Sequence, residues 1–141
     1  MSQEKYPVKT PQQYILEDED LINNAETRAP ITVCVDCSFS MRQQHRLDRV
    51  MEGLESFCRE LSANETACAS VELCIVSYGG TMARVEQDFT PPDRVRLPKL
   101  TAAGETPLAD AVKAALHNLD MRKQRYQDNG NSYYRPWLIL M

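Results

Sequence analysis

Residues 31–41 read Ile-Thr-Val-Cys-Val-Asp-Cys-Ser-Phe-Ser-Met, and this stretch decides the fold. Its first five residues are apolar and rich in β-branched side chains, which is typical of a strand buried on both faces of a parallel sheet. Asp36 follows at the carboxyl end of that strand, where open α/β sheets bind their ligands. Ser38 and Ser40 come next at alternate positions. Because these three side chains offer only oxygen atoms, the sequence predicts a site for a hard cation such as Mg²⁺.

The rest of the chain predicts a doubly wound α/β fold with a mostly parallel sheet. Apolar residues at helical spacing predict a helix over residues 46–61, and a β-rich run predicts a strand over residues 71–77. Alternating side chains over residues 83–89 predict an antiparallel edge strand, and residues 137–141 predict a last strand. With right-handed crossovers, the expected strand order is third, second, first, fourth, which opens a crevice at the carboxyl end of the first strand.

A second long helix is predicted to end near Arg125, and residues 62–70 before the second strand are predicted to be a connection. The helix is expected to bury an apolar face made of Leu108, Ala111, Val112, Ala115, Leu116 and Leu119.

Length and composition limit the classes of function. The 141 residues suffice for one domain, which we place at residues 28–141 after a polar arm over residues 1–27. The net charge of −4 without a basic stripe argues against a nucleic-acid partner. No apolar stretch approaches the roughly 20 residues that span a bilayer, so no membrane association is expected. Residues 1–10 lack the apolar core of a signal peptide, so we expect a cytoplasmic protein.

The five cysteines are expected to be free thiols in a reducing compartment. Cys34 and Cys37 form a Cys-x-x-Cys spacing, which raises a redox or zinc interpretation. Residues three apart along a strand face opposite sides of the sheet, and no second pair stands at zinc-finger spacing. We therefore interpret this spacing as incidental, with Cys34 in the core and Cys37 in the following loop.

The Asp-x-Ser-x-Ser pattern of Asp36, Ser38 and Ser40 resembles the metal-ion-dependent adhesion site of von Willebrand factor type A domains. In a second segment, Gly-Glu-Thr-Pro-Leu over residues 104–108 is similar to the loop of that family that contributes a threonine, here Thr106. The resemblance covers about residues 28–141.

The resemblance implies a protein-binding module rather than an enzyme. Asp36, Ser38, Ser40 and Thr106 would hold Mg²⁺, or Mn²⁺ or Ca²⁺ in its place. An acidic residue of a protein partner would fill the open coordination position. The rim of this site is expected to include Phe39, Glu105 and His45.

The sequence also departs from the family pattern. The family places a further Asp directly after the fourth strand, whereas this sequence stops at residues 137–141. We therefore expect a domain that lacks its C-terminal strands, binds metal weakly or not at all, and pairs two copies through the edge of its last strand. Phe39 stands where the family usually has Gly, and we expect an ordinary backbone and a partly exposed ring there.

Residues 23–30 resemble the entry segment of bacterial von Willebrand A proteins linked to tellurite resistance and stress, with Ala25 replacing the usual Pro.

Two alternatives stay open. One is a vestigial or truncated domain without metal binding. The other is a haloacid dehalogenase-like phosphatase, in which Asp36 would be the nucleophile, but Ser38 stands where that family has a second acid. No nucleophile with a base and no phosphate-cradling glycine loop can be assembled from these residues, so no enzymatic activity is expected.

Overall fold

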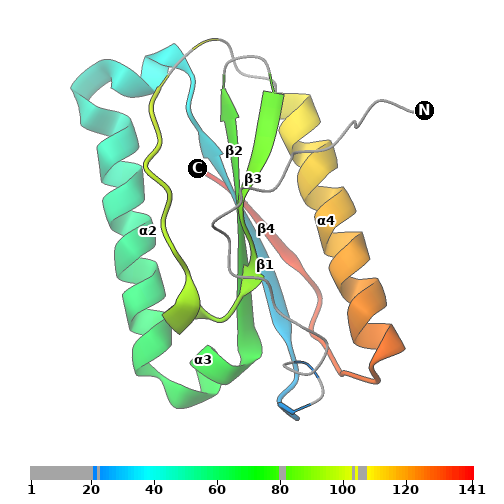
Figure 1. Ribbon diagram of the computed structural model, residues 1–141. Coiled ribbons are helices and arrows are strands. Elements are labelled where there is room, and N and C mark those ends of the chain that lie inside the picture. Colours follow the sequence, from blue (N-terminus) through cyan, green and yellow to red (C-terminus); the bar gives the residue numbers. More distant parts are fainter. Residues whose placement is uncertain (1–20, 22, 80–81, 103, 105–107) are drawn as a thin grey trace.

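Four strands form one sheet in the order β3-β2-β1-β4 (Figure 1). The computed structural model describes residues 21, 23–79, 82–102, 104 and 108–141. Within these residues the strands are β1 (Ala29–Asp36), β2 (Val71–Gly79), β3 (Met82–Thr90) and β4 (Trp137–Leu140). β1 runs parallel to β2 and β4, while β2 and β3 are antiparallel. The predicted strand order and the mostly parallel sheet with one antiparallel edge strand are therefore confirmed.

One long helix covers each face of the sheet, α2 (Arg46–Ala63) on one side and α4 (Leu108–Asp128) on the other (Figure 1). A 3₁₀ segment, η1 (Phe39–His45), leads from β1 into α2, and another, η2 (Pro92–Arg94), follows β3. None of the described helices is long and apolar enough to cross a bilayer.

Residues 62–70 were predicted to be a connection. This prediction was wrong in part, since Glu65–Ser70 form the short helix α3. Its start is stabilised by Asn64, whose side-chain oxygen accepts a hydrogen bond from the Ala67 amide at 3.0 Å. A six-residue helix of small residues has too little periodicity to be recognised from the sequence.

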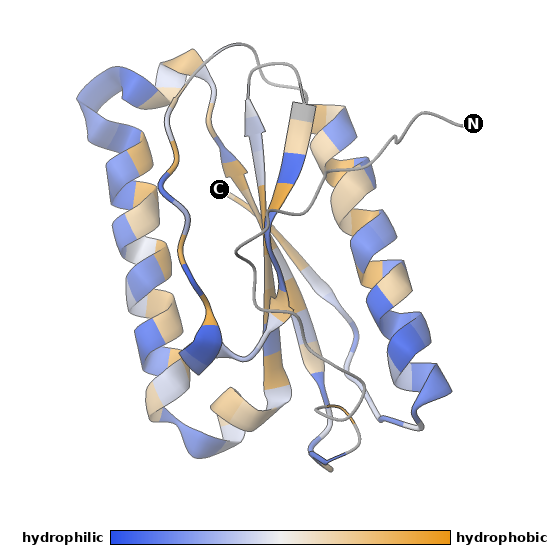
Figure 2. Ribbon diagram, in the orientation of Figure 1, coloured by the Kyte–Doolittle hydropathy of each residue, from blue (hydrophilic) through white to orange (hydrophobic). Residues whose placement is uncertain are grey.

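Alternate residues of the strands pack on opposite helices. Val33 and Val35 of β1 lie in the core beneath α2, and Cys34 lies in the core beneath α4. Cys37 follows β1 in a loop, is buried, and belongs to the α2 side. The two cysteines of the Cys-x-x-Cys spacing thus lie on opposite sides of the sheet, as predicted, and all five thiols are free. Figure 2 shows the hydrophobic residues concentrated on the strands and alternating with hydrophilic ones along the helices.

The face of α4 that packs on the sheet differs from the predicted one. Leu108 and Leu116 were predicted to be buried, yet they are 44% and 49% exposed. Arg122 and Tyr126 are buried instead, because both donate hydrogen bonds to the buried carboxylate of Glu72 in β2. A buried charge is stable when it is paired and hydrogen-bonded, which a pattern of apolar residues does not reveal. The prediction was correct for Ala111, Ala115 and Leu119.

The chain before β1 is anchored to the core and to α3. Leu21 is fully buried, and the Asn24 side chain donates a hydrogen bond to the Ala69 carbonyl at 2.9 Å. Residues 1–20 and 22 of the predicted polar arm lie outside the described residues.

Candidate functional site

The carboxyl end of β1 is fixed by main-chain hydrogen bonds from both sides. The amide of Asp36 donates to the carbonyl of Met141 at 2.9 Å, and the amide of Cys37 donates to the carbonyl of Tyr78 at 2.7 Å. Asp36 is half-buried and ends the strand that lies between β2 and β4. Its carboxylate therefore emerges at the edge where the parallel strands end, which is the usual ligand-binding edge of such sheets.

Two hydrogen bonds link the three oxygen-bearing residues of the sequence motif in the loop after β1. Asp36 Oδ1 accepts a hydrogen bond from the Ser38 amide at 2.7 Å, which folds the loop back onto the carboxylate. Ser38 Oγ lies 3.0 Å from Ser40 Oγ. Ser38 is buried, whereas Ser40 is exposed, so the hydroxyl pair runs from the protein interior to the solvent.

A second segment, far along the chain, is bound to this loop. The Phe39 amide donates to the carbonyl of Gly104 at 3.2 Å, and Arg42 Nε donates to the carbonyl of Ala102 at 3.0 Å. Thr106 and Glu105, which the sequence assigned to the site and its rim, lie outside the described residues. The structure places Gly104 beside Phe39, within the motif itself.

The rim of the candidate site contains an exposed aromatic ring, Phe39, that stacks against the guanidinium of Arg42. The Phe39 side chain is 56% exposed, and the Arg42 guanidinium carbon lies 5.1 Å from the centre of its ring. Phe39 does not have a positive φ, so the predicted ordinary backbone and partly exposed ring are confirmed. Arg42 carried no signal in the sequence, because its partner is a main-chain carbonyl.

The last two residues of η1, directly before α2, have left-handed backbones: Gln44 has φ 53° and His45 has φ 55°. Each such residue costs on the order of 1 kcal/mol when it is not glycine. His45 precedes α2, and its Nδ1 lies 3.3 Å from Asp48 Oδ2. No glycine marks this strained corner, so it could not be recognised from the sequence.

The thiol of Cys37, which lies beside the site, is protonated near neutral pH. Burial, followed by the charges of Glu86 and Asp36, raises the pKa of Cys37 to about 11. Burial likewise raises the pKa of Tyr78, with the charge of Asp36 as the next cause. Among the described residues, no group of three or more His, Cys, Asp or Glu side chains could hold a metal.

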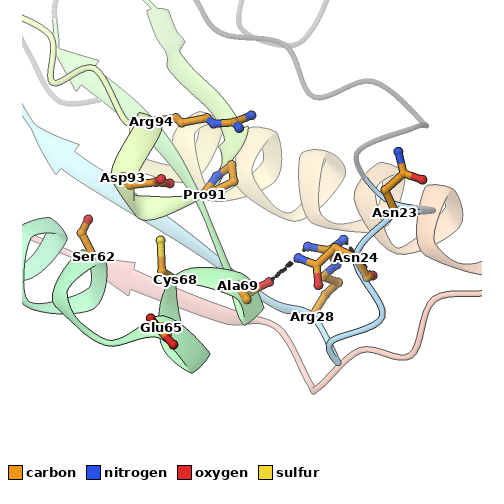
Figure 3. Close-up of a pocket in the computed structure, with 10 residues that line it drawn as sticks. All are labelled: Asn23, Asn24, Arg28, Ser62, Glu65, Cys68, Ala69, Pro91, Asp93 and Arg94. Atoms are coloured by element: carbon orange, nitrogen blue, oxygen red, sulfur yellow. Dashed lines mark hydrogen bonds between the residues drawn. The ribbon is translucent and has the colours of Figure 1, made fainter.

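A pocket of about 480 Å³ lies near the amino end of β1, opposite the candidate site (Figure 3). The guanidinium of Arg28 in its wall donates to the carbonyls of Leu21, Asn24 and Ala69 at 3.2–3.3 Å. Burial raises the pKa of the Cys68 thiol there, which makes it a poor nucleophile. These contacts hold the chain that enters β1, and we assign Arg28 a structural role.

Comparison with known families agrees with this architecture of an α/β sheet covered by a helix on each face. Residues 31–132 match the von Willebrand factor type A domain. The chain therefore belongs to the von Willebrand factor type A domain family. Domains of this family typically act as protein-interaction modules, and they often bind divalent cations. A comparison with curated proteins found no match.

Proposed function

We propose that this chain is a metal-dependent protein-binding module. Asp36, Ser38, Ser40 and Thr106 hold Mg²⁺, and a carboxylate of a partner protein completes the coordination. The observation that supports this most is that hydrogen bonds link Asp36 to Ser38 and Ser38 to Ser40 at the carboxyl end of β1. The carbonyls of Ala102 and Gly104 are hydrogen-bonded to Arg42 and Phe39 of the same loop.

The spacing of the two hydroxyls is compatible with the proposed ion. Mg²⁺ binds oxygens at about 2.0–2.1 Å in an octahedron, so adjacent ligand oxygens are about 2.9 Å apart. Ser38 Oγ and Ser40 Oγ lie 3.0 Å apart. Ca²⁺ prefers more oxygens at longer distances, and a set with one carboxylate and three hydroxyls therefore favours the smaller ion.

The same donor set explains why a partner is needed. One carboxylate neutralises half of the charge of a divalent cation, while hydroxyls leave the rest. A partner's carboxylate then gains a charge-assisted contact with fixed geometry. We propose that the ion binds weakly on its own and tightly only together with the partner, in the cytoplasm, where free thiols such as these persist.

The test is a titration with Mg²⁺ followed by amide NMR shifts. We expect shifts at residues 36–42 and at Gly104, and their loss in Ser38→Ala. Ser56→Ala is the matched control, because Ser56 is an exposed serine in α2, away from the site. No shifts at about 10 mM Mg²⁺, a range in which even weak sites fill, would support the vestigial alternative. Shifts that persist unchanged in Ser38→Ala would also contradict the proposal.

We also propose that β4 mediates self-association. β4 lies at one edge of the sheet, next to β1. Trp137 and Leu140 on this strand are 66% and 52% exposed. A strand edge with large exposed apolar side chains readily adds a strand from another chain, and two copies can do so around a two-fold axis.

A further inference from the structure

A pocket of about 250 Å³ lies next to the proposed metal site. Its floor is apolar: Leu47 and Ala102 are buried, and Met41 and Leu100 are partly buried. Its rim is polar and exposed, and consists of Arg42, His45, Asp48 and Thr101.

We propose that this pocket receives an aliphatic side chain of the partner, one or two residues away from the partner's metal-binding carboxylate. This inference rests on the proposed function and specifies its ligand: an extended segment that carries an acidic residue and, at a fixed offset, a leucine-sized apolar residue.

The pocket and the metal site are built from the same two segments. Met41 directly follows Ser40, and Ala102 lies two residues before Gly104, whose carbonyl binds the Phe39 amide. Arg42 connects the two segments through its hydrogen bond to Ala102. A partner chain whose carboxylate reaches Ser40 therefore passes the mouth of the pocket.

The size and lining of the pocket select its occupant. Small-molecule sites measure roughly 300–1,000 Å³, so a volume of about 250 Å³ suits one side chain rather than a cofactor. The buried floor is made of aliphatic and thioether groups, which favours an aliphatic side chain.

The charged residues of the pocket rim determine which partner residues are favoured next to the aliphatic side chain. Arg42 uses Nε for Ala102 and lays its guanidinium over the Phe39 ring. Among the described residues, no further hydrogen bond or ion pair of Arg42 occurs, so its outer edge can accept a carboxylate in a bidentate manner. His45, whose backbone is left-handed, is another rim residue. Asp48, the acidic residue of the rim, lies 3.3 Å from His45, so an acidic residue of the partner is favoured beside Arg42.

The experiment selects peptides from a displayed library of linear peptides with one fixed central Asp, in buffer with Mg²⁺. We expect enrichment of Leu, Ile, Val or Met at one fixed offset from the Asp. Replacing that residue by Ala in a synthetic peptide should weaken binding about tenfold, as expected for the loss of a mostly buried aliphatic side chain. Thr101→Trp, at the exposed rim, should abolish the preference while the requirement for Asp persists.

Lys99→Trp is the control, because Lys99 is exposed in the same segment and does not line the pocket. As a readout independent of the variants, the ¹³C methyl signal of Met41 should shift with the aliphatic peptide and not with its Ala version. Binding that needs Mg²⁺ and Asp but shows no preference at any offset would overturn the pocket and leave the proposed function intact. A preference that persists in Thr101→Trp would overturn the pocket as well. If no peptide binds in a way that needs Mg²⁺ and Asp, the proposed function fails and the pocket proposal fails with it.

Discussion

Arg42 Nε donates a hydrogen bond to the carbonyl oxygen of Ala102, which lies 60 residues further along the chain, at 3.0 Å. This contact joins the loop after β1 to the segment that precedes α4. It acts on the site from outside, because Arg42 is not one of the proposed metal ligands. The relative position of the two segments therefore depends partly on a residue that the metal motif does not contain.

Arg42→Ala should weaken Mg²⁺ and peptide binding while leaving the fold intact. The lost hydrogen bond is worth about 0.5–1.5 kcal/mol, so the affinity should fall roughly two- to tenfold. Titration calorimetry measures the affinity, and thermal unfolding measures the stability. Arg59→Ala is the control, since Arg59 is an exposed arginine of α2 paired with Glu55. Equal affinities for both variants would contradict the role of Arg42.

Arg122→Leu should destabilise the protein by about 3–5 kcal/mol, because it leaves the buried Glu72 carboxylate without its closest cation. Arg122 Nε and Nη2 donate to Glu72 at 2.7 and 3.0 Å, and both side chains are at most 4% exposed. Urea denaturation followed by circular dichroism measures the loss.

Lys123→Leu serves as the comparison for this buried pair. Lys123 is the next residue of α4, and its ion pair with Asp120 is more exposed, with Asp120 at 78%. Removing it should change the free energy of unfolding by less than about 1 kcal/mol. If both variants lost the same free energy, the buried pair would have no special part in stability.

The strand order was predictable because it follows from local patterns. The apolar run before Asp36 and the alternation over residues 83–89 each identify a strand, and handedness limits how such strands connect. The face of α4 was not predictable, because Arg122 is buried by a partner 50 residues away in sequence. The left-handed corner at Gln44 and His45 also had no signal, since no glycine marks it.

The candidate site was predictable in part, for a similar reason. Asp36, Ser38 and Ser40 are adjacent in sequence, and a strand end followed by a tight loop brings them together. The pocket beside them combines Met41 with Leu100, and its rim depends on the contact of Arg42 with Ala102. Such long-range contacts have no signature in a single sequence.

The stability should fall as the pH rises from about 9 to about 11. Burial raises the pKa of Cys34 from its ordinary value of 9.0 to about 11. In this interval the unfolded chain has lost the thiol proton while the folded chain retains it, so folding weakens as the pH increases. Below pH 9 both states are protonated, and the stabilisation is fully present.

The contribution of Cys34 is isolated by comparing variants, since other groups also titrate in this range. Two pKa units correspond to about 2.7 kcal/mol, most of which is lost by pH 11, so wild type should lose about 2 kcal/mol more free energy of unfolding than Cys34→Val between pH 8 and 11. Cys68→Val is the control, because Cys68 is only partly buried. Parallel pH profiles for wild type and Cys34→Val would contradict this prediction.

Trp137→Ser should shift the protein toward the monomer if β4 mediates self-association. Its large exposed side chain adds apolar area to the interface, and a central aromatic residue commonly contributes about 2 kcal/mol or more to an interface. Sedimentation velocity over a range of concentrations measures the association. Tyr134→Ser is the control, because Tyr134 is 61% exposed and precedes the strand. A wild type that stays monomeric at every concentration would exclude the proposed interface.

Gln44→Gly should stabilise the protein although it removes a side chain. Gln44 has φ 53°, and glycine adopts this backbone without the penalty of about 1 kcal/mol that Gln bears. The gain is reduced by the greater freedom of glycine in the unfolded chain, so a net increase of about 0.5 kcal/mol is expected. Gln43→Gly is the matched control, because Gln43 has φ −66° and glycine there should only destabilise.

If the strain also shapes the rim of the pocket, Gln44→Gly should bind the library peptides more weakly while melting at a higher temperature. Weaker binding without a gain in stability would instead indicate that the Gln44 side chain itself contacts the partner.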